Sequence, residues 1–537
     1  MRVSRRAVMG MLAAAGSGLL ADGRLVRAAQ VGSKTPDDFE HPAGAEIAAG
    51  PFAGTRESLG KYEVPEWFRD AKFGMWAHWG PQSAIGEGDW YARNMYIEGS
   101  EQYDYHVQRY GPQSRFGYKD TIPAWRGERF DPAALIKLYK AAGAKYFMSM
   151  GVHHDNFDLW DSRYQRWNAA KMGPHKDIVA MWRDAARAEG LRFGVSEHLW
   201  ITYKWYSVSH GSDATGPLKG VKYDGAEAAN RDLYVASDQI WGDPLEWNEN
   251  GIPLWWRQQW FKRVKDLVDH CEPDFLYSDG ALPFEYYGYN LVAHLYNQSA
   301  RRGRESGGGG KTEAVYFSKR REDGESGICV LDRERGVIEE IDPRPWQSDT
   351  CIGQWHYKFG QKYKTPKQIV DQLVDIVSRN GNLMLNIPLP ASGEPDAEEL
   401  AIIAELTAWM KVNGEGIFGT RTWKVAGEGP PAIAKASELA AQFNESARHD
   451  LTAEDVRFTV KGATLYAFVM GWPEYEVKIK SLAQGTELRV GKIENVELLG
   501  FGGKLEWQQS GEGLVVRVPR GEAPTKYGVV FKVMGAV

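Results

Sequence analysis

The chain has 537 residues, more than a single hydrophobic core usually serves, so its length predicts two domains. Its composition, 43% hydrophobic and 25% charged residues, is typical of a folded globular protein and excludes a disordered chain. A formal net charge of −6 disfavours nucleic acids and anionic membranes as partners, because both bind concentrated basic surfaces. The 21 tryptophans and 25 tyrosines favour either carbohydrate binding, by stacking on sugar rings, or a tryptophan-rich core.

The first residues are typical of an export signal. Arg5 and Arg6 precede a short apolar stretch that runs to Ala21, and "VRAA" at 26–29 offers small residues for cleavage. The arginine pair predicts a bacterial twin-arginine signal over residues 1–28, with an ordinary Sec signal as the alternative. We therefore expect a periplasmic or extracellular protein with no membrane contact once the signal is removed, since no other segment is apolar for long enough to span a bilayer.

Three cysteines, Cys271, Cys329 and Cys351, are an odd number without a CxxC pair. This pattern excludes a zinc site made of cysteines and allows at most one disulfide. Because twin-arginine substrates cross the membrane already folded, we expect buried free thiols.

Apolar runs alternate with amphipathic stretches between residues 70 and 410. The runs are continuously apolar, as in strands that are buried on both faces. Eight strands are predicted, at residues 72–80, 144–154, 191–198, 273–280, 314–319, 327–331, 346–353 and 382–390, of which 346–353 is the weakest.

The stretches between these strands have the ends of helices. Residues 131–143 begin with Asp-Pro and end with glycine, and residues 365–381 begin with Thr365 and Gln368, the pattern of a capping box. About eight strand–helix repeats predict a (β/α)₈ barrel, which we place at residues 52–412. An open doubly wound sheet is the alternative, weakened because no GxGxxG fingerprint follows the first strand.

Two segments interrupt the alternation. Residues 199–251 form a long predicted loop after the third strand, and residues 301–310 are basic and then glycine-rich, which predicts an exposed, mobile connection. If the aromatic residues serve carbohydrate binding, Trp200 and Trp205 of this loop would contact the part of the ligand that lies beyond the main pocket. After the barrel, short alternating runs predict an antiparallel β-sandwich over residues 415–537. The aromatic residues of the loop are Trp200, Trp205, Tyr206, Tyr223, Trp241 and Trp247.

Polar side chains directly follow four of the predicted strands. In a barrel of this class the active site lies at the carboxyl ends of the strands, so these residues are candidates for chemistry. Asp279 is the sharpest candidate, because a carboxylate fixed at the rim can act as a nucleophile or stabilise a cation, although a helix cap or a salt bridge would also explain it. The candidates are His78 and Trp79, His153 and His154, Glu197 and His198, and Asp279.

The adjacent histidines raise the question of a metal site. Zinc enzymes usually place their histidines in HxH or HExxH patterns, whereas neighbours on an extended strand point to opposite faces unless a bulge intervenes. His153 and His154 are therefore poorly placed to chelate one ion, and we expect them to hydrogen-bond the hydroxyl groups of a ligand or to tune a neighbouring carboxylate. We predict no metal and no other cofactor.

Five longer motifs lie along the barrel: "WFRDAKFGMWAHWG" followed by "DWY", "HHDNFDLWDS", "DIVAMWRDAARAEGLRFGV", "PDFLYSDG" and "NGNLMLNIPLP". Over about residues 65–395 they resemble the alpha-L-fucosidases of glycoside hydrolase family 29. The resemblance implies a (β/α)₈-like barrel followed by a β-sandwich, and a retaining double displacement without a metal. It also implies a fucosylated oligosaccharide or glycoconjugate as substrate, from which a terminal α-L-fucosyl residue is removed.

The same resemblance implies roles for single residues. It places the nucleophile at Asp279, and it places Trp355 where the family has an aromatic ring against the methyl group of the sugar. Asp89 stands where the family has a glutamate, so its reach to a hydroxyl is shorter, and "SEH" at 196–198 replaces a tyrosine. The substrate-binding residues are expected to be His78, Asp89, Trp90, His153, His154, Glu197, His198 and Trp355.

The second catalytic carboxylate is expected in "CVLDRERGVIEEID", which has several acidic residues. Glu334 lies just past the apolar strand, as the acid/base of related enzymes does, so we choose it. The other candidates, Asp332, Glu339 and Glu340, are expected in a solvated loop.

Three alternatives to an α-L-fucosidase stay open. An α-L-galactosidase would use a similar pocket, a metal-dependent hydrolase would use the histidines as ligands, and a non-catalytic sugar-binding protein would keep the scaffold without the chemistry. The sequence does not indicate the preferred linkage or the oligomeric state.

Overall fold

The computed structural model describes residues 46–537, apart from residues 236, 238, 242–248, 308, 434, 435 and 440–442. The predicted export signal at residues 1–28 and the loop residue Trp247 lie outside the described residues. Among the helices that the structure describes, none is both long and apolar enough to cross a membrane.

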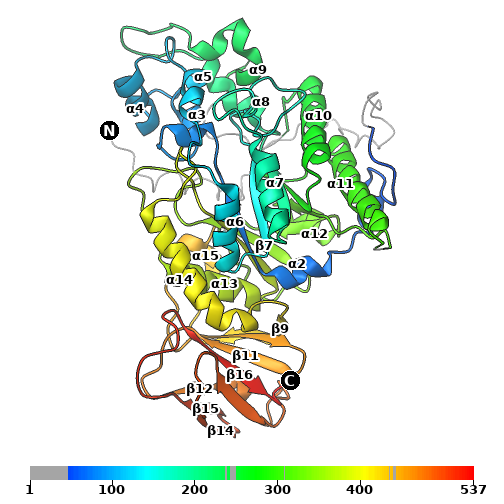
Figure 1. The fold of residues 1–537 in the computed structure, drawn as a ribbon, viewed down its shortest axis with the longest axis vertical. Helices are drawn as coiled ribbons and strands as arrows, with labels where there is room; N and C mark the ends of the chain where they lie inside the picture. The colour runs from blue at the N-terminus through cyan, green and yellow to red at the C-terminus, as the bar shows by residue number, and fades with distance from the viewer. Residues whose placement is uncertain are drawn as a thin grey trace, which may run out of the picture. The chain divides into compact units, whose positions relative to one another are not determined.

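Eight parallel strands form a closed barrel in chain order, with the last strand paired to the first. The C-terminal strands lie below the helices of the barrel in Figure 1. The predicted (β/α)₈ barrel is confirmed, including the weakly predicted strand at residues 346–353, and an open doubly wound sheet is excluded. Both faces of most strands are buried, which explains the continuous apolar runs. The strands are β1 (Phe73–Ala77), β2 (Tyr146–Val152), β3 (Arg192–Glu197), β4 (Phe275–Ser278), β5 (Val315–Ser318), β6 (Val330–Asp332), β7 (Trp346–Cys351) and β8 (Gly381–Asn386).

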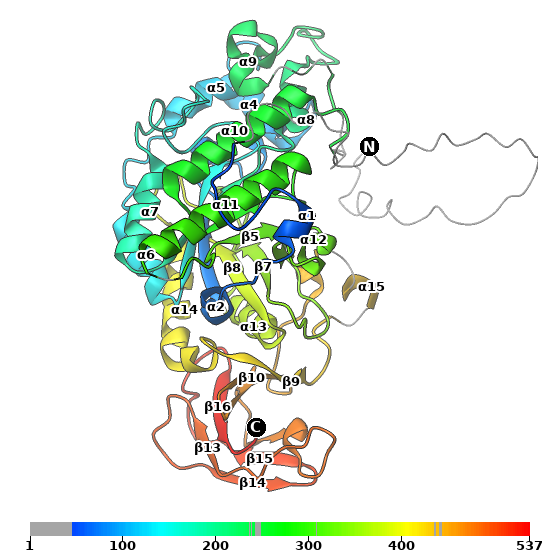
Figure 2. The ribbon, with the colours of Figure 1, turned by 90° about the vertical axis from the view of Figure 1, so that its right-hand side faces the viewer.

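Helices surround the barrel (Figure 2). The longer ones are α6 (Pro132–Ala141), α7 (Ile178–Ala188), α10 (Leu254–Cys271), α11 (Tyr286–Glu305), α13 (Pro366–Ser378) and α14 (Ala397–Asn413). Thr365 and Gln368 form the expected capping box of α13. Between β6 and β7 the chain forms no helix, so residues 333–345 are a loop. The remaining helices are α1 (Arg56–Leu59), α2 (Glu66–Ala71), α3 (Tyr91–Asn94), α4 (Glu101–Tyr110), α5 (Tyr118–Thr121), α8 (Thr202–Trp205), α9 (Arg231–Tyr234), α12 (Arg321–Glu325) and α15 (Ala436–Leu439).

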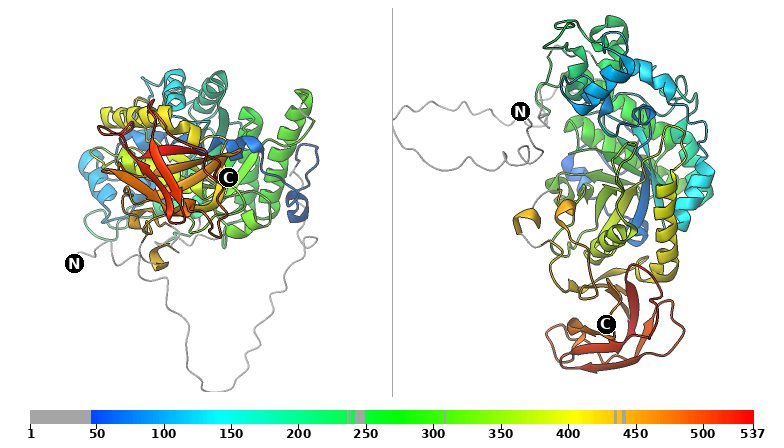
Figure 3. Two further views of the ribbon diagram at one scale, coloured as in Figure 1. Left: turned by 90° about the horizontal axis from the view of Figure 1, so that it is seen from below. Right: turned by 90° about the vertical axis from the view of Figure 1, so that its left-hand side faces the viewer.

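The chain after α14 folds into two antiparallel sheets that enclose one hydrophobic core (Figure 3). The predicted β-sandwich is confirmed. One sheet has the order β13 (Asn495–Leu498), β16 (Val529–Met534), β11 (Thr464–Val469), β10 (Val456–Lys461), β9 (Arg421–Glu428). The other has the order β12 (Glu476–Ile479), β15 (Gly513–Arg517), β14 (Glu506–Ser510).

Two segments differ from their prediction. The described part of residues 199–251, predicted as a long loop, includes the short helices α8 and α9 and buries the rings of Trp205 and Tyr206 completely. The connection predicted at residues 301–310 begins as helix, since α11 runs through Glu305. The prediction for the cysteines is confirmed: all three are free and buried.

Candidate active site

The carboxyl ends of the barrel strands border a cavity of about 600 Å³. This volume lies in the range of pockets that enclose small ligands. Phe443, from the chain after β9, is the one lining residue that comes from beyond the barrel. The lining residues are Trp76, His78, Asp89, Trp90, His153, His198, Trp200, Tyr277, Asp279, Gly280, Ala281, Lys319, Arg320, Glu334, Asp349, Trp355 and Phe443.

Asp279 follows β4 at the centre of this cavity. Its carboxylate lies 3.1 Å from His198 Nδ1 and 3.4 Å from His154 Nε2, and Lys319 Nζ contacts its other oxygen. Burial opposes ionisation, but the charge of Lys319 and the hydrogen bonds from the histidines hold the pKa of Asp279 well below its usual value. Asp279 is therefore an ionised carboxylate at neutral pH.

The residue after Asp279 has to be a glycine. Gly280 has φ +141°, and a Cβ there would come within 2.9 Å of the ring of Trp200. That indole also donates to the carbonyl of Asp279 at 2.5 Å, so Trp200 fixes the backbone of the nucleophile candidate.

Lys319 joins the two candidate catalytic carboxylates, and our sequence analysis missed it. Its ammonium contacts Asp279 Oδ1 and lies 2.5 Å from Glu334 Oε2. Burial alone would lower the pKa of Lys319, but Asp279 and Glu334 raise it well above its usual value, so the side chain keeps its charge. Because one nitrogen contacts both groups, the facing oxygens of Asp279 and Glu334 lie within about 5 Å, close to the separation in retaining glycosidases.

Glu334 follows β6 and faces the cavity, as the sequence analysis expected. Its second oxygen accepts a hydrogen bond from Trp355 Nε1 at 3.2 Å. The ring of Trp355 lies 4.8 Å from that of His78, centroid to centroid. Trp355 is thus both a wall of the cavity and a hydrogen-bond donor to Glu334.

A buried pair of carboxyl groups lies beneath Lys319. Asp332 was expected in a solvated loop, which is wrong: it is the last residue of β6 and is 1% exposed. Burial raises the pKa of Asp332 to about 6, and burial next to Asp332 raises the pKa of Asp349 well above its usual value. Burial therefore favours the protonated forms of this pair over those of free aspartates. Of the remaining candidates, Glu339 and Glu340 are exposed, as expected.

The histidines surround the cavity as mostly neutral rings. Burial lowers the pKa of His78 and His153 well below the usual value, and it lowers the pKa of His198 to about 4. His198 Nε2 is buried and has no hydrogen-bond partner among the described residues, so it is available to a ligand. Neutral imidazoles both donate and accept, which suits hydroxyl groups.

Asp89 is held by a histidine that the sequence analysis missed. Its carboxylate lies 2.7 Å from His356 Nδ1 and 3.8 Å from His153 Nε2. The sequence analysis did not select His356, because this residue follows a loop rather than a predicted strand.

Among the described residues, two groups of side chains could hold a metal ion, His153 with His154 and His198, and Asp89 with His153 and His356. In each, the donor atoms lie within 4.8 Å of one another. The argument that adjacent histidines diverge is wrong here, because the register shifts near the end of β2 and both histidines lie beyond its last residue. Their ring centroids are 4.7 Å apart. That the enzyme needs no metal stays a prediction.

Four candidates do not line the cavity, and one of them, His154, contacts Asp279 from behind its wall. Glu197 is fully buried, and its carboxylate accepts hydrogen bonds from Leu199 N at 2.9 Å and Trp260 Nε1 at 3.0 Å. Since neighbours on a strand alternate, His198 faces the cavity and Glu197 faces the surrounding helices, so its expected contact with substrate is wrong. Trp79 donates to Pro390 O at 2.8 Å, and Trp205 is buried, so neither reaches the cavity.

Comparisons with known proteins agree on one family. The sequence profile described as Alpha-L-fucosidase matches residues 42–415, and the profile described as Alpha-L-fucosidase C-terminal domain matches residues 448–534. The tissue alpha-L-fucosidase of Bos taurus is 26% identical over 89% of this chain and 90% of its own length. The plasma alpha-L-fucosidase of Homo sapiens is 26% identical over 89% of this chain and 91% of its own. The structure of the Thermotoga maritima alpha-fucosidase in complex with fucose shares the fold, with a TM-score of 0.66 and 24% identity over 90% of this chain and 100% of that one.

Proposed function

The chain belongs to the alpha-L-fucosidase family and is a glycoside hydrolase; we propose that it removes terminal α-L-fucosyl residues from glycans by a retaining double displacement. Asp279 is the nucleophile and Glu334 is the acid and base. One observation carries this assignment: a single ammonium, that of Lys319, contacts both carboxylates at the cavity.

In the first step, Asp279 attacks the anomeric carbon while Glu334 gives a proton to the leaving oxygen, and the bond to that oxygen breaks. In the second step, Glu334 takes a proton from water, the water attacks the anomeric carbon, and the bond from that carbon to the Asp279 oxygen breaks, which releases the carboxylate and fucose. Lys319 favours the ionised form of Asp279, which suits the attack by that carboxylate.

The terminal sugar is held by hydrogen bonds and one apolar contact. His78, His153 and His198 supply donors and acceptors for its hydroxyls. Trp355 lies against His78 and beside Glu334, where its ring can pack on the methyl group that distinguishes a 6-deoxy sugar from a hexose.

The stereochemistry of the first product tests the proposed mechanism. We expect proton NMR of the hydrolysis of an aryl α-L-fucoside to show α-L-fucose first, with the β-anomer following by mutarotation. If β-L-fucose is released first, the enzyme inverts, and the covalent role of Asp279 is wrong.

We further propose export through the twin-arginine pathway to the periplasm or beyond. The support is the pair Arg5 and Arg6 before a short apolar stretch. Replacing both by lysine, which keeps the charge, should leave the precursor in the cytoplasm. Normal export of that variant would indicate a Sec signal instead.

A further inference from the structure

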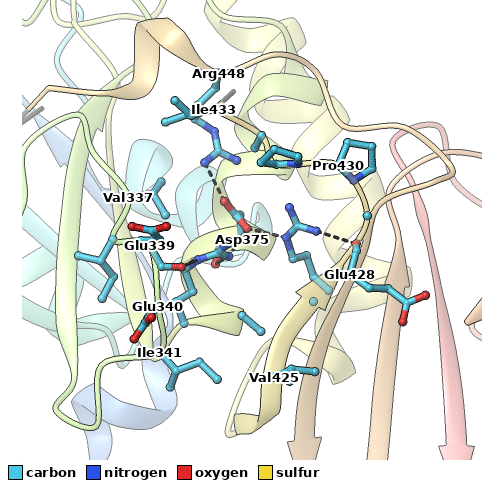
Figure 4. Close-up of a pocket in the computed structure, with 18 of the residues that line it drawn as sticks. Val337, Glu339, Glu340, Ile341, Asp375, Val425, Glu428, Pro430, Ile433 and Arg448 are labelled. Atoms are coloured by element: carbon cyan, nitrogen blue, oxygen red, sulfur yellow. Dashed lines mark hydrogen bonds and ion pairs between the residues drawn. The ribbon is translucent and has the colours of Figure 1, made fainter. Parts of the chain in front are cut away.

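A second cavity, of about 560 Å³, shares no lining residue with the active-site cavity (Figure 4). The loop after β6 and the end of α13 form one side of it, and β9, the following residues 429–433 and Arg448 form the other. We call it the arginine cavity, because three arginines meet in its wall.

These arginines surround one carboxylate, that of Asp375 on α13. Arg448 Nη1 lies 2.7 Å from it and Arg457 Nε 2.6 Å, and Arg379 Nη1 is a third contact (Figure 4). Burial alone would raise the pKa of Asp375, but the three guanidiniums hold it well below its usual value. Asp375 thus supplies one negative charge against three permanent positive charges.

A second carboxylate, that of Asp455, does not neutralise the two remaining positive charges. Asp455 Oδ1 lies 4.0 Å from Arg457 Nη1, which leaves one positive charge without an anion. Asp371, which also faces Arg448, is paired with Lys367 at 2.9 Å.

The other acidic residues of the wall do not supply the missing charge. Glu428 is turned away, since its carboxylate accepts from the backbone nitrogens of Lys480 and Ser481 at 2.8 and 2.6 Å (Figure 4). Glu339 and Glu340 are solvent-exposed, so their charges are screened by water and salt.

Arg448 pairs with Asp375 through one nitrogen only. Its side chain is 8% exposed, and its Nη2 is buried with no hydrogen-bond partner among the described residues. A buried guanidinium nitrogen without an acceptor is costly, so an anion that reaches it would bind favourably.

The cavity is too large for a simple ion alone. Its volume is typical of pockets that take small organic molecules, and Pro430, Pro431 and Ile433 form an apolar part of the wall. A ligand that fills it has an organic body beside its anionic group.

We propose that the arginine cavity binds an anionic sugar, whose carboxylate or sulfate group is held by Arg448 and whose ring packs against the two prolines. The site is separate from the one that hydrolyses fucosides, and it would take a uronic acid or a sulfated monosaccharide.

Calorimetric titration of the full chain tests this site. The active site is first saturated with L-fucose, and galactose 6-sulfate, glucuronate, galactose and sodium sulfate are then added in separate titrations. We expect at least one of the two anionic sugars to bind at one site, and galactose not to bind. Arg448→Gln should weaken that binding about tenfold or more, because a charge-assisted hydrogen bond is lost. Arg517→Gln, at an exposed pair on β15, is the matched control and should bind as the wild type does.

Two further measurements keep the test decisive. Fucosidase activity of Arg448→Gln checks that the variant is folded, and Ala432→Trp fills the cavity without changing a charge. Both variants should lose sugar binding and keep activity. The proposal is overturned if neither anionic sugar binds the wild type, or if both variants bind it equally well. Binding of sodium sulfate as tightly as the sulfated sugar would mean an adventitious ion only.

Discussion

Two carboxylates of this chain lie among cations, Asp279 in the active-site cavity and Asp375 in the arginine cavity. Asp279 contacts one permanent cation, Lys319, which it shares with Glu334, and its other neighbours include the neutral His198. Asp375 contacts three guanidiniums and is only 1% exposed. Both are ionised, yet only Asp279 borders a cavity with a second carboxylate at reacting distance. A lowered pKa alone therefore does not identify a nucleophile; access and a partner acid do.

The largest effect is expected when Lys319 loses its charge. Lys319→Met should lower kcat/KM on an aryl α-L-fucoside about 100-fold, the scale of one lost electrostatic contact in an active site. Because Lys319 depresses the pKa of Asp279, its loss should raise that pKa and move the acidic limb of the pH profile to higher pH. Lys319→Arg keeps the positive charge, so the acidic limb of its pH profile should stay where it is in the wild type. An unchanged profile in Lys319→Met would show that Lys319 is only structural.

Removing the charge of Asp375 in the arginine cavity should lower the stability of the fold and leave fucoside hydrolysis unchanged. Asp375→Asn leaves three buried arginines with one fewer anion, so we expect a loss of about 3–5 kcal/mol in the free energy of unfolding, measured with urea. A depressed carboxyl pKa contributes stability above the unfolded value near 4, and that contribution disappears as the pH falls through the folded value. The difference from the wild type should therefore shrink in acid. Asp70→Asn, at an exposed pair, should cost less than about 1 kcal/mol. Equal losses in both variants would contradict the account.

The sugar methyl group should have a smaller effect. If the ring of Trp355 packs on C6, an aryl α-L-fucoside should be cleaved several-fold faster than the matching α-L-galactoside, since the contact is worth on the order of 1 kcal/mol. Trp355→Phe keeps an apolar ring and should keep most of the preference. Equal kcat/KM values for the two sugars in the wild type would mean that the pocket is not built around a methyl group.

Chelation should have no effect. The histidines near Asp279 could hold an ion, but the proposed mechanism uses them only as hydrogen-bonding groups. Dialysis against EDTA should leave kcat/KM unchanged. If activity disappears and zinc restores it, the metal-dependent alternative is favoured.

Much of the fold could be predicted because local patterns determined it. The eight continuously apolar runs became the eight strands, and the capping box at Thr365 began α13. The rule that polar residues at strand ends form the site found His78, His153, His198 and Asp279. The same rule applies to Lys319, which directly follows β5, but the sequence analysis did not apply it there.

The remaining site residues depend on the closed barrel rather than on local pattern. Asp349 lies within β7, where a carboxyl group is costly, and only the approach of Asp332 and Lys319 explains it. The prediction that Glu197 binds substrate was wrong for a local reason. Strand alternation turns its side chain away from the cavity that His198 faces. The prediction that Trp205 contacts the ligand was wrong because its segment, predicted as a loop, buries the ring completely.

The central claim is that Asp279 attacks and Glu334 assists, and rescue by azide tests it most directly. Asp279→Gly should lose turnover, and azide should restore it by entering from the vacated side to give the β-L-fucosyl azide. Glu334→Ala should still form the ester from a substrate with a good leaving group, and azide should then give the α-L-fucosyl azide after a second inversion. Opposite anomers from the two variants are the predicted result. The same anomer from both, or near-normal rates of Glu334→Ala on poor leaving groups, would contradict the assignment.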